Sequence, residues 1–287
     1  MAKTVSFIKN IFKSLFDTLP SSIRVSLHHF INQQGKKSKT LKSNYTNLTT
    51  EFSKSNQTSL VSVIMPSWNR KDIIAKSIDS VLLQSYKNIE LIIADDGSTD
   101  NTVDFIKSNY EKQITSGKII LISNDHVGVS FTRNSALLLA KGKFIAYLDS
   151  DNTWEKDYLL IMVNSLVEKP QFTSCYSGLR IKNYQTGRAE ILLEETFSYY
   201  NLSQINFIDI NAFVHSSLLL KEYGYFDIEL SRLVDWDLIL RYTKKSSPLM
   251  VPIAAVNYYL SNRLNNITFQ ENFTENFSKV KEKNNRI

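Results

Sequence analysis

Two carboxylates that directly follow an apolar segment are the strongest chemical signal in the sequence. Asp149 and Asp151 flank Ser150 immediately after the run Phe144–Leu148, which has the composition of a buried strand. Alternate residues of an extended segment point the same way, so both carboxylates can face one cation or its hydration shell. A divalent ion held there can also bind phosphate oxygens and offset the charge of a departing nucleoside diphosphate. A turn of acidic residues without a ligand is the competing interpretation.

A second acidic pair, Asp95 and Asp96, ends another apolar run at Ile89–Ala94. Residues 97–100 contain a glycine that permits a positive φ and hydroxyl side chains that can cap the next helix. This turn chemistry explains residues 97–100 without a ligand, but it explains the two carboxylates only in part, because adjacent carboxylates repel each other. A nucleobase imide N–H is a donor that would accommodate them. We therefore treat both as candidate nucleotide-binding residues.

Two further polar features are candidates for nucleotide contact. Ser67, Asn69 and Arg70 follow the first apolar run, where a loop can line a nucleotide pocket, although turn chemistry explains parts of this loop equally well. Arg133 lies inside the apolar stretch 127–140, and an arginine in a helix packed on a sheet needs a partner. A structural carboxylate and a ligand phosphate remain equal alternatives for that partner.

The elements that must position these residues alternate between strands and helices. Strands are predicted at 61–65, 89–94, 118–123 and 144–148, and helices from about 72, at 99–110 and at 128–140. Strands that are apolar on both faces indicate an α/β fold with a mostly parallel sheet covered by helices on both sides. Ligands bind such sheets at the carboxyl ends of the strands, where all the polar clusters above lie.

The second half of the chain is less regular, and we expect it to form the other side of the binding site. Two strands around a turn are predicted within 172–195, a helix at 234–242, and one or two strands at 249–260. His215 follows an expected strand and is more typical of a structural histidine than of a ligand. The segment 258–268 is a candidate for closing over a nucleotide bound at these polar clusters.

The N-terminal residues differ in charge from the rest of the chain. Residues 1–58 hold nine Lys or Arg against two acidic residues, whereas the whole chain carries a net charge of +6, so the remainder is nearly neutral. This distribution argues against nucleic-acid binding. Apolar residues at helical spacing predict an amphipathic helix at 5–19, and the polar tract 32–59 is typical of a linker. The helix either contacts an anionic membrane surface or packs on the catalytic domain or a second copy.

Composition gives the expected location and domain boundaries. Cys175 is the single cysteine, so an internal disulfide is excluded and a reducing cytosol fits best. The sequence has no apolar run of the roughly 18 residues that a membrane span needs, so we expect a cytoplasmic protein, either free or held at the inner face of the plasma membrane. The expected parts are an extension at 1–58, the main domain at 59–265 and a polar tail at 266–287.

An ordered set of motifs resembles the family 2 glycosyltransferases of the GT-A fold over about residues 60–260. Each motif alone is weak, but their order and spacing together are specific. The motifs are Val61 to Pro66 with Trp68-Asn69-Arg70, Asp95 to Asp100, Gly128 to Asn134, Leu148 to Asp151, Gly224-Tyr225-Phe226-Asp227, and Asp235-Trp236-Asp237.

The resemblance implies a role for each candidate residue. The implied nucleotide-binding residues are Ser67, Asn69, Arg70, Asp95, Asp96, Arg133 and Asp149, the implied ligands of Mn²⁺ or Mg²⁺ are Asp151 and Asp149, and the implied general base is Asp235, with Asp237 as the alternative. The implied reaction is a single inverting transfer from a nucleotide-sugar, UDP-linked by expectation, to a glycan or lipid-linked glycan of a surface polysaccharide. The chain departs from the family pattern at two positions, because Asn152 and Val234 stand where many relatives have acidic residues.

Other functions are less consistent with the sequence. A sugar nucleotidyltransferase needs a glycine-rich loop after the first strand, and a dinucleotide oxidoreductase needs G-x-G-x-x-G there, whereas this loop contains no glycine. A non-catalytic protein that binds a nucleotide-sugar or serves as a scaffold remains the alternative to the transferase.

Overall fold

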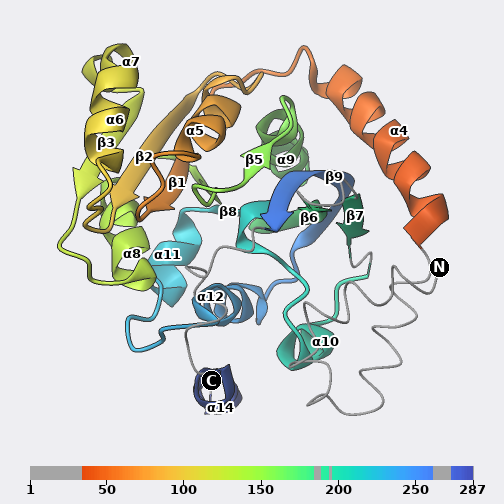
Figure 1. Cartoon of the computed structure of the whole chain (residues 1–287). Coiled ribbons are helices and arrows are strands. Elements are labelled where there is room, and N and C mark those ends of the chain that lie inside the picture. The colour runs from red at the N-terminus through yellow and green to blue at the C-terminus, as the bar shows by residue number, and fades with distance from the viewer. Residues whose placement is uncertain (1–33, 184–188, 194–195, 261–272, 287) are drawn as a thin grey trace.

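A nine-stranded mixed sheet organises the chain, and the computed structural model describes residues 34–183, 189–193, 196–260 and 273–286 (Figure 1). The strand order is β3-β2-β1-β4-β8-β6-β9-β5, and β7 pairs with β6. The first four strands are parallel, as predicted, and are β1 (Val61–Ser67), β2 (Ile89–Asp95), β3 (Ile119–Ser123) and β4 (Phe144–Tyr147).

The parallel strands bring the predicted polar clusters to one edge of the sheet. β1 lies between β2 and β4, and Ser67 is in register with Asp95 at the carboxyl ends of β1 and β2. Helices follow β1, β2 and β3 in turn, which confirms the predicted alternation. These helices are α5 (Ile74–Leu82), α6 (Thr102–Asn109) with α7 (Glu111–Thr115), and α8 (Val129–Leu139).

The second half extends the sheet with mostly antiparallel pairs. β8 (Phe213–Ser216) pairs with β4 and β6, and the strands predicted within 172–195 are β6 (Ser174–Asn183) and β7 (Ala189–Leu192). The 249–260 segment is one strand, β9, which pairs with β5. The remaining elements are β5 (Thr153–Trp154), α9 (Tyr158–Glu168), α10 (Tyr199–Gln204), η1 (Ile210–Ala212), α11 (Leu218–Tyr223), α12 (Val234–Thr243), β9 (Leu249–Leu260) and α14 (Phe273–Arg286).

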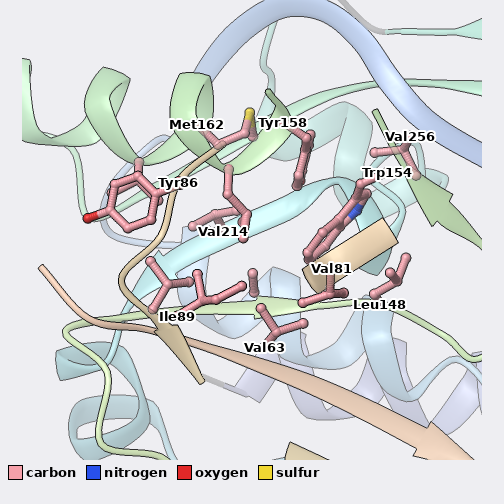
Figure 2. Packing of buried hydrophobic residues seen from close by; sticks show 14 of the residues in the cluster. Val63, Val81, Tyr86, Ile89, Leu148, Trp154, Tyr158, Met162, Val214 and Val256 are labelled. Carbon is pink, nitrogen blue, oxygen red and sulfur yellow. The ribbon is translucent and has the colours of Figure 1, made fainter. Parts of the chain in front are cut away.

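Helices cover both faces of the sheet because its central strands are apolar on both sides. Val63 of β1 belongs to the cluster formed with α5, α6 and α9, whereas its neighbour Ile64 packs with α8, α11 and α12. Figure 2 shows part of the first cluster, with Tyr158 and Met162 of α9 opposite Val63. The sheet is therefore a rigid support for the loops at its edge.

The structure differs from the expected linker at 32–59, because this tract forms the helix α4 (Gln34–Phe52). Leu41 and Phe52 are buried in the core, and Tyr45 and Leu48 pack against it at helical spacing between them. The Tyr45 hydroxyl also accepts the backbone N–H of Asp157 at 3.0 Å. Apolar residues are sparse in this tract, but nearly all of them lie on one helical face, which lies against α9 and β9 (Figure 1).

The tail expected at 266–287 contains the helix α14, which packs on α12 (Figure 1). The Trp236 and Phe277 rings lie 5.5 Å apart, and Val280 is fully buried. No helix in the described ranges is long and apolar enough to cross a membrane. The helix expected at 5–19 and most of the segment 258–268 lie outside the described residues, so those predictions remain open.

Candidate active site

A buried ion pair joins α8 to the loop after β4. Arg133 Nη2 lies 2.6 Å from Asp149 Oδ1, and the arginine side chain is only 7% exposed. The guanidinium carbon also lies 5.3 Å from the centroid of the Phe226 ring. The partner that the sequence required for Arg133 is therefore a carboxylate of the protein, and contact with a ligand phosphate stays a prediction.

The second carboxylate of the pair, Asp151, meets the loop that follows β1. Arg70 Nη2 lies 3.6 Å from Asp151 Oδ2, and the Asp151 side chain is 32% exposed. Burial, together with repulsion from Asp149, raises the pKa of Asp151 to about 6. The loops after β1 and β4 and helix α8 thus form one polar site with two arginines and two carboxylates.

These carboxylates fit a divalent cation such as Mn²⁺ or Mg²⁺. Asp149 and Asp151 supply hard oxygen donors, and a bound cation would favour the ionised form of Asp151, whose pKa is raised by burial and then by the charge of Asp149. No group of three or more His, Cys, Asp or Glu side chains suited to a metal occurs in the part of the chain that the structure describes. Mg²⁺ commonly binds through one or two carboxylates and completes its coordination with waters and substrate phosphates, which is consistent with this pair.

The Asp95-Asp96 pair already has protein donors. Asp95 accepts the Ser98 backbone N–H at 2.8 Å and the Ser98 hydroxyl at 2.6 Å. Asp96 accepts the backbone N–H groups of Val127 and Gly128 and a hydroxyl, all at the start of α8. Since the first helical N–H groups lack intrahelical partners, this carboxylate stabilises the helix terminus. Contact of either residue with a base stays a prediction.

Ser98 does not cap the following helix, as its hydroxyl is bound to Asp95. Helix α6 begins at Thr102, three residues later than predicted, because Asn101 adopts a left-handed φ of 65° immediately before it. The Asp100 carboxylate accepts the Thr102 backbone N–H at 3.0 Å. Turn chemistry at 98–102 therefore shapes the loop, and Asp100, not Ser98, accepts the first backbone N–H of α6.

Asn69 ties the β1 loop to the β2 loop. Its side-chain oxygen accepts the Thr99 backbone N–H at 2.9 Å, and its own backbone N–H donates to the Ser98 hydroxyl at 2.8 Å. Ser67, in contrast, is buried, and its hydroxyl has no hydrogen-bond partner among the described residues. Asn69 thus shapes the loop, whereas the Ser67 hydroxyl is buried at the sheet edge, and its contact with a nucleotide stays a prediction.

Asp235 lies in the first turn of α12 and is partly buried. Asn206 Nδ2 donates to Asp235 Oδ2 at 3.3 Å. Burial raises the pKa of Asp235 above its usual value, Arg133 lowers it, and Asp149 raises it further. This electrostatic coupling to Arg133 and Asp149 is consistent with a catalytic role for Asp235 beside the carboxylates of Asp149 and Asp151. That role stays a prediction.

The structure argues against Asp237 as the alternative base. Asp237 is fully buried, and its Oδ2 lies 2.9 Å from Arg241 Nη2 and 3.4 Å from Lys283 Nζ. Arg241 also donates to the backbone carbonyls of Tyr223 and Tyr225. Asp237 therefore joins α12 to α14 and to the loop after α11. It points away from Asp235, because residues two apart on a helix point in different directions.

Replacing Asp237 with Asn is expected to lower the free energy of unfolding by about 3–5 kcal/mol, because it leaves the buried guanidinium of Arg241 without its counter-ion. Urea unfolding checks this. The matched control is Glu275→Gln, which breaks an exposed pair with Lys279 on α14 and should leave stability nearly unchanged. Equal stability of Asp237→Asn and the wild type would contradict the structural role.

Asp209 and Asn211 also lie at this site, although the sequence analysis did not select them. Asn211 Nδ2 contacts both Asp149 Oδ2 at 3.1 Å and Asp209 Oδ1 at 2.8 Å. Burial is the main cause that raises the pKa of Asp209 to about 7, and Asp149 and Asp235 add to it. No motif marks these residues, and an Asp-x-Asn at the start of the strand expected at 211–214 was the only available signal.

The raised pKa of Asp209 predicts a pH-dependent stability. A carboxyl group whose pKa is higher in the folded chain stabilises the fold at low pH, and this contribution is lost as pH rises through about 7. Asp209→Asn stays neutral, so its melting temperature should rise relative to that of the metal-free wild type between about pH 5 and about pH 8. Thermal unfolding measures the difference, and a difference that does not change with pH would rule out the shift.

His215 of β8 is structural, in line with the expectation from sequence. It is fully buried, its Nε2 lies 2.9 Å from the Tyr147 hydroxyl, and its Nδ1 lies 2.8 Å from the Ser216 carbonyl. Burial lowers the pKa of His215 to about 4, so the ring is neutral near pH 7. The residue belongs to the packing beneath the site.

The sequence model described as Glycosyl transferase family 2 matches residues 62–221, which is more than half of the chain. The chain belongs to glycosyl transferase family 2. The match contains β1 to β8 and the Asp149-Ser150-Asp151 motif, and it ends before Asp235 and α12. The family predicted from the ordered motifs is therefore confirmed.

Similar proteins support the family and the fold. A relative from Escherichia coli, the UDP-Glc:alpha-D-GlcNAc-diphosphoundecaprenol beta-1,3-glucosyltransferase WfaP, is 48% identical over 96 residues, which are 33% of this chain and 36% of that protein. The chain spans about half or less of the length of the first curated relatives it matches.

Solved structures share the GT-A fold. Staphylococcus aureus TarS 1-349 in complex with UDP-GlcNAc gives a TM-score of 0.62 at 19% identity, covering 77% of this chain and 64% of that one. The mannosyltransferase PcManGT from Pyrobaculum calidifontis, in complex with GDP-Man and Mn²⁺, gives 0.55 at 17% identity, covering 81% and 68%. The predicted fold class is thereby confirmed.

Proposed function

We propose that this family 2 protein transfers a sugar from a UDP-linked donor to a hydroxyl group of a glycan or lipid-linked glycan. One observation carries the proposal: Arg133, Asp149 and Asp151 meet at the carboxyl edge of the sheet, and Asp235 is electrostatically coupled to the first two. An anionic donor and a proton acceptor are both required for such a transfer, and this edge supplies groups suited to each.

The donor side combines cations and carboxylates. Arg70 and Arg133 offer guanidinium groups for phosphate, and each already lies within 4 Å of a carboxylate, so the loops are held in place before a ligand arrives. Asp149 and Asp151 would hold a bound Mn²⁺ or Mg²⁺. Such an ion supplies Lewis-acid stabilisation of the diphosphate leaving group.

The acceptor side requires a proton acceptor, for which we propose Asp235. Its carboxylate takes the proton from the acceptor hydroxyl while the hydroxyl oxygen bonds to the anomeric carbon. The bond between that carbon and the diphosphate oxygen breaks in the same step, and the nucleoside diphosphate leaves with its electron pair. One displacement from the opposite face inverts the anomeric configuration. The pKa of Asp235, raised by burial, makes it a better base than an exposed aspartate.

The relatives suggest which substrates to test first. WfaP is named for UDP-Glc as donor and GlcNAc-diphosphoundecaprenol as acceptor, and one TarS structure contains UDP-GlcNAc. We propose a donor and an acceptor of these chemical classes for this chain. A panel of UDP- and GDP-sugars, scored by release of the nucleotide with Mn²⁺ and with a chelator, tests the donor class and the metal dependence together.

A non-catalytic binding protein or scaffold is the alternative. It predicts calorimetric binding of UDP with no nucleotide release from any donor, with and without acceptor. The partly buried Asp235 with its raised pKa favours the enzyme, because a scaffold has no need for a carboxylate held in that state.

We also propose that residues 5–19 contact an anionic membrane surface, where a lipid-linked acceptor would be found. The test is flotation with vesicles that contain an anionic phospholipid, comparing the full chain with a chain that starts at Gln34 and so keeps α4. The full chain should float and the shortened one should not. Equal flotation of the two would refute this contact.

A further inference from the structure

A single buried side chain holds both the backbone and the carboxylate of Asp149. Asn211, which is 1% exposed, accepts the Asp149 backbone N–H at its Oδ1 over 2.6 Å. Its Nδ2 donates to Asp149 Oδ2 over 3.1 Å. Arg133 occupies the other carboxylate oxygen, Oδ1. Asp149 is therefore fixed from two directions, by a cation on one side and by an amide on the other.

Asp209 determines which way the amide of Asn211 points. Asp209 Oδ1 accepts both the backbone N–H and the Nδ2 of Asn211, each at 2.8 Å. A carboxylate accepts hydrogen bonds and an amide nitrogen donates them, so Asp209 orients Nδ2 toward the two carboxylates and leaves Oδ1 for the Asp149 backbone. The reversed amide would place its oxygen against the oxygens that Asn211 Nδ2 now contacts on Asp149 and Asp209.

The hydrophobic core anchors the same turn. Trp154, which is 4% exposed, donates its indole N–H to the Asn211 carbonyl at 2.9 Å, and its ring stacks on Tyr158 of α9 at 4.7 Å. The η1 turn that carries Asn211 is thus connected directly to the packed face of the sheet. A rigid support of this kind restricts the position of a functional carboxylate.

The turn that carries this pair also approaches the proposed base. Asn206 lies three residues before Asp209 and donates to Asp235 at 3.3 Å. Loop 206–211 therefore contacts Asp149 through Asn211 at one end and the proposed base Asp235 through Asn206 at the other. The contacts with Asp149 are shorter and more numerous, so the donor side is where this loop should have its main effect.

We propose that Asp209 and Asn211 are positioning residues that hold Asp149 in the orientation required for binding the nucleotide-sugar. The proposal rests on the proposed function, because it assigns Asp149 to the donor. Neither residue needs to touch the substrate. Partners that orient a ligating carboxylate typically contribute about 10–100-fold to affinity or activity.

Asn211→Asp is the sharpest test, because it keeps the shape and the acceptor for the Asp149 backbone but replaces Nδ2 with an oxygen. That oxygen would face Asp149 and Asp209, so the Asp149 carboxylate should turn away. We expect UDP binding in the presence of Mn²⁺ to weaken by about 10–100-fold and the KM for the donor to rise to a similar extent. The KM for the acceptor should change by less than about twofold, since the change acts on donor binding.

Asn164→Asp is the matched control. Asn164 is also buried, at 3% exposure, and donates to the Leu160 carbonyl inside α9, away from the site. This variant should lose thermal stability but bind UDP as the wild type does. Asp209→Asn should weaken UDP binding less than Asn211→Asp, because its amide oxygen can still accept from Asn211 and it places no new charge beside Asp149.

The outcomes separate the two proposals. UDP binding that weakens in Asn211→Asp and not in Asn164→Asp supports the positioning role. Unchanged UDP binding in Asn211→Asp, or a loss that is equal in the control, overturns it while the proposed function stands. Absence of both UDP binding and nucleotide release in the wild-type chain overturns the proposed function, and the positioning role with it.

Discussion

Replacing Asp235 with Asn is expected to lower kcat by about 10²–10⁴-fold, the contribution typical of a general base. Asparagine has nearly the same shape but cannot take the acceptor proton. The KM for the donor should stay within a few-fold, because Asp149 and Arg133 remain paired in this variant. Steady-state kinetics with the best donor of the panel measures both parameters.

The pH profile adds a second measure of the same residue. The raised pKa of Asp235 places the acidic limb of the wild-type kcat profile above the usual carboxylate range, because only the ionised form accepts a proton. Asp235→Asn should lack this limb. Asp104→Asn, an exposed acid in the first turn of α6, should behave as the wild type. A kcat for Asp235→Asn within threefold of the wild type would remove Asp235 from the proposed mechanism.

Replacing Asp151 with Asn is expected to abolish the Mn²⁺-dependent part of UDP binding. Asp151 is the more exposed carboxylate of the pair, and its nearest cation, Arg70, lies 3.6 Å away, so its oxygens remain accessible to a metal ion. Loss of its charge leaves Asp149, which already accepts from Arg133 and Asn211. Calorimetry with UDP, with and without Mn²⁺, measures the difference.

The control for Asp151 is Glu155→Gln, which lies four residues later and pairs with Arg180 at 3.0 Å outside the Asp149 site. We expect this variant to keep the full response to Mn²⁺. The metal-free Asp151→Asn protein should also be slightly more stable than the wild type near neutral pH, because it lacks a carboxylate whose pKa is raised to about 6. An undiminished effect of Mn²⁺ on UDP binding by Asp151→Asn would refute the metal site.

The position of the polar site at the carboxyl edge of the sheet could be predicted, because the sequence patterns that indicate it are local. Strands that are apolar on both faces require helices on both sides, and parallel strands place their carboxyl ends together, so Asp95 and Asp149 could be assigned to one edge from the sequence. Arg133 required a partner for the same local reason. The structure supplies what the sequence left open, namely that this partner is Asp149.

Features that depend on distant contacts were not predictable in the same way. The family resemblance ranked Asp235 above Asp237 as the base, but residue type alone does not separate them, and the pairing of Asp237 with Arg241 and Lys283 is visible only in the structure. Asn211 has no motif, and its role follows from its contact with Asp149, which lies 62 positions earlier in the chain. Helix α4 was missed because its few apolar residues are stabilised by tertiary contacts more than by helix propensity.

The most direct test of the proposed function is to identify the product of the reaction. Wild-type chain is incubated with UDP-Glc, Mn²⁺ and a GlcNAc-diphospho-lipid, with UDP-GlcNAc and the other donors of the panel in parallel, and the lipid is analysed by mass spectrometry. We predict that one donor yields a lipid heavier by one sugar unit, together with an equal amount of released nucleotide. Absence of nucleotide release and of any mass change with every donor, while UDP still binds, would show that the site binds a nucleotide without catalysing transfer.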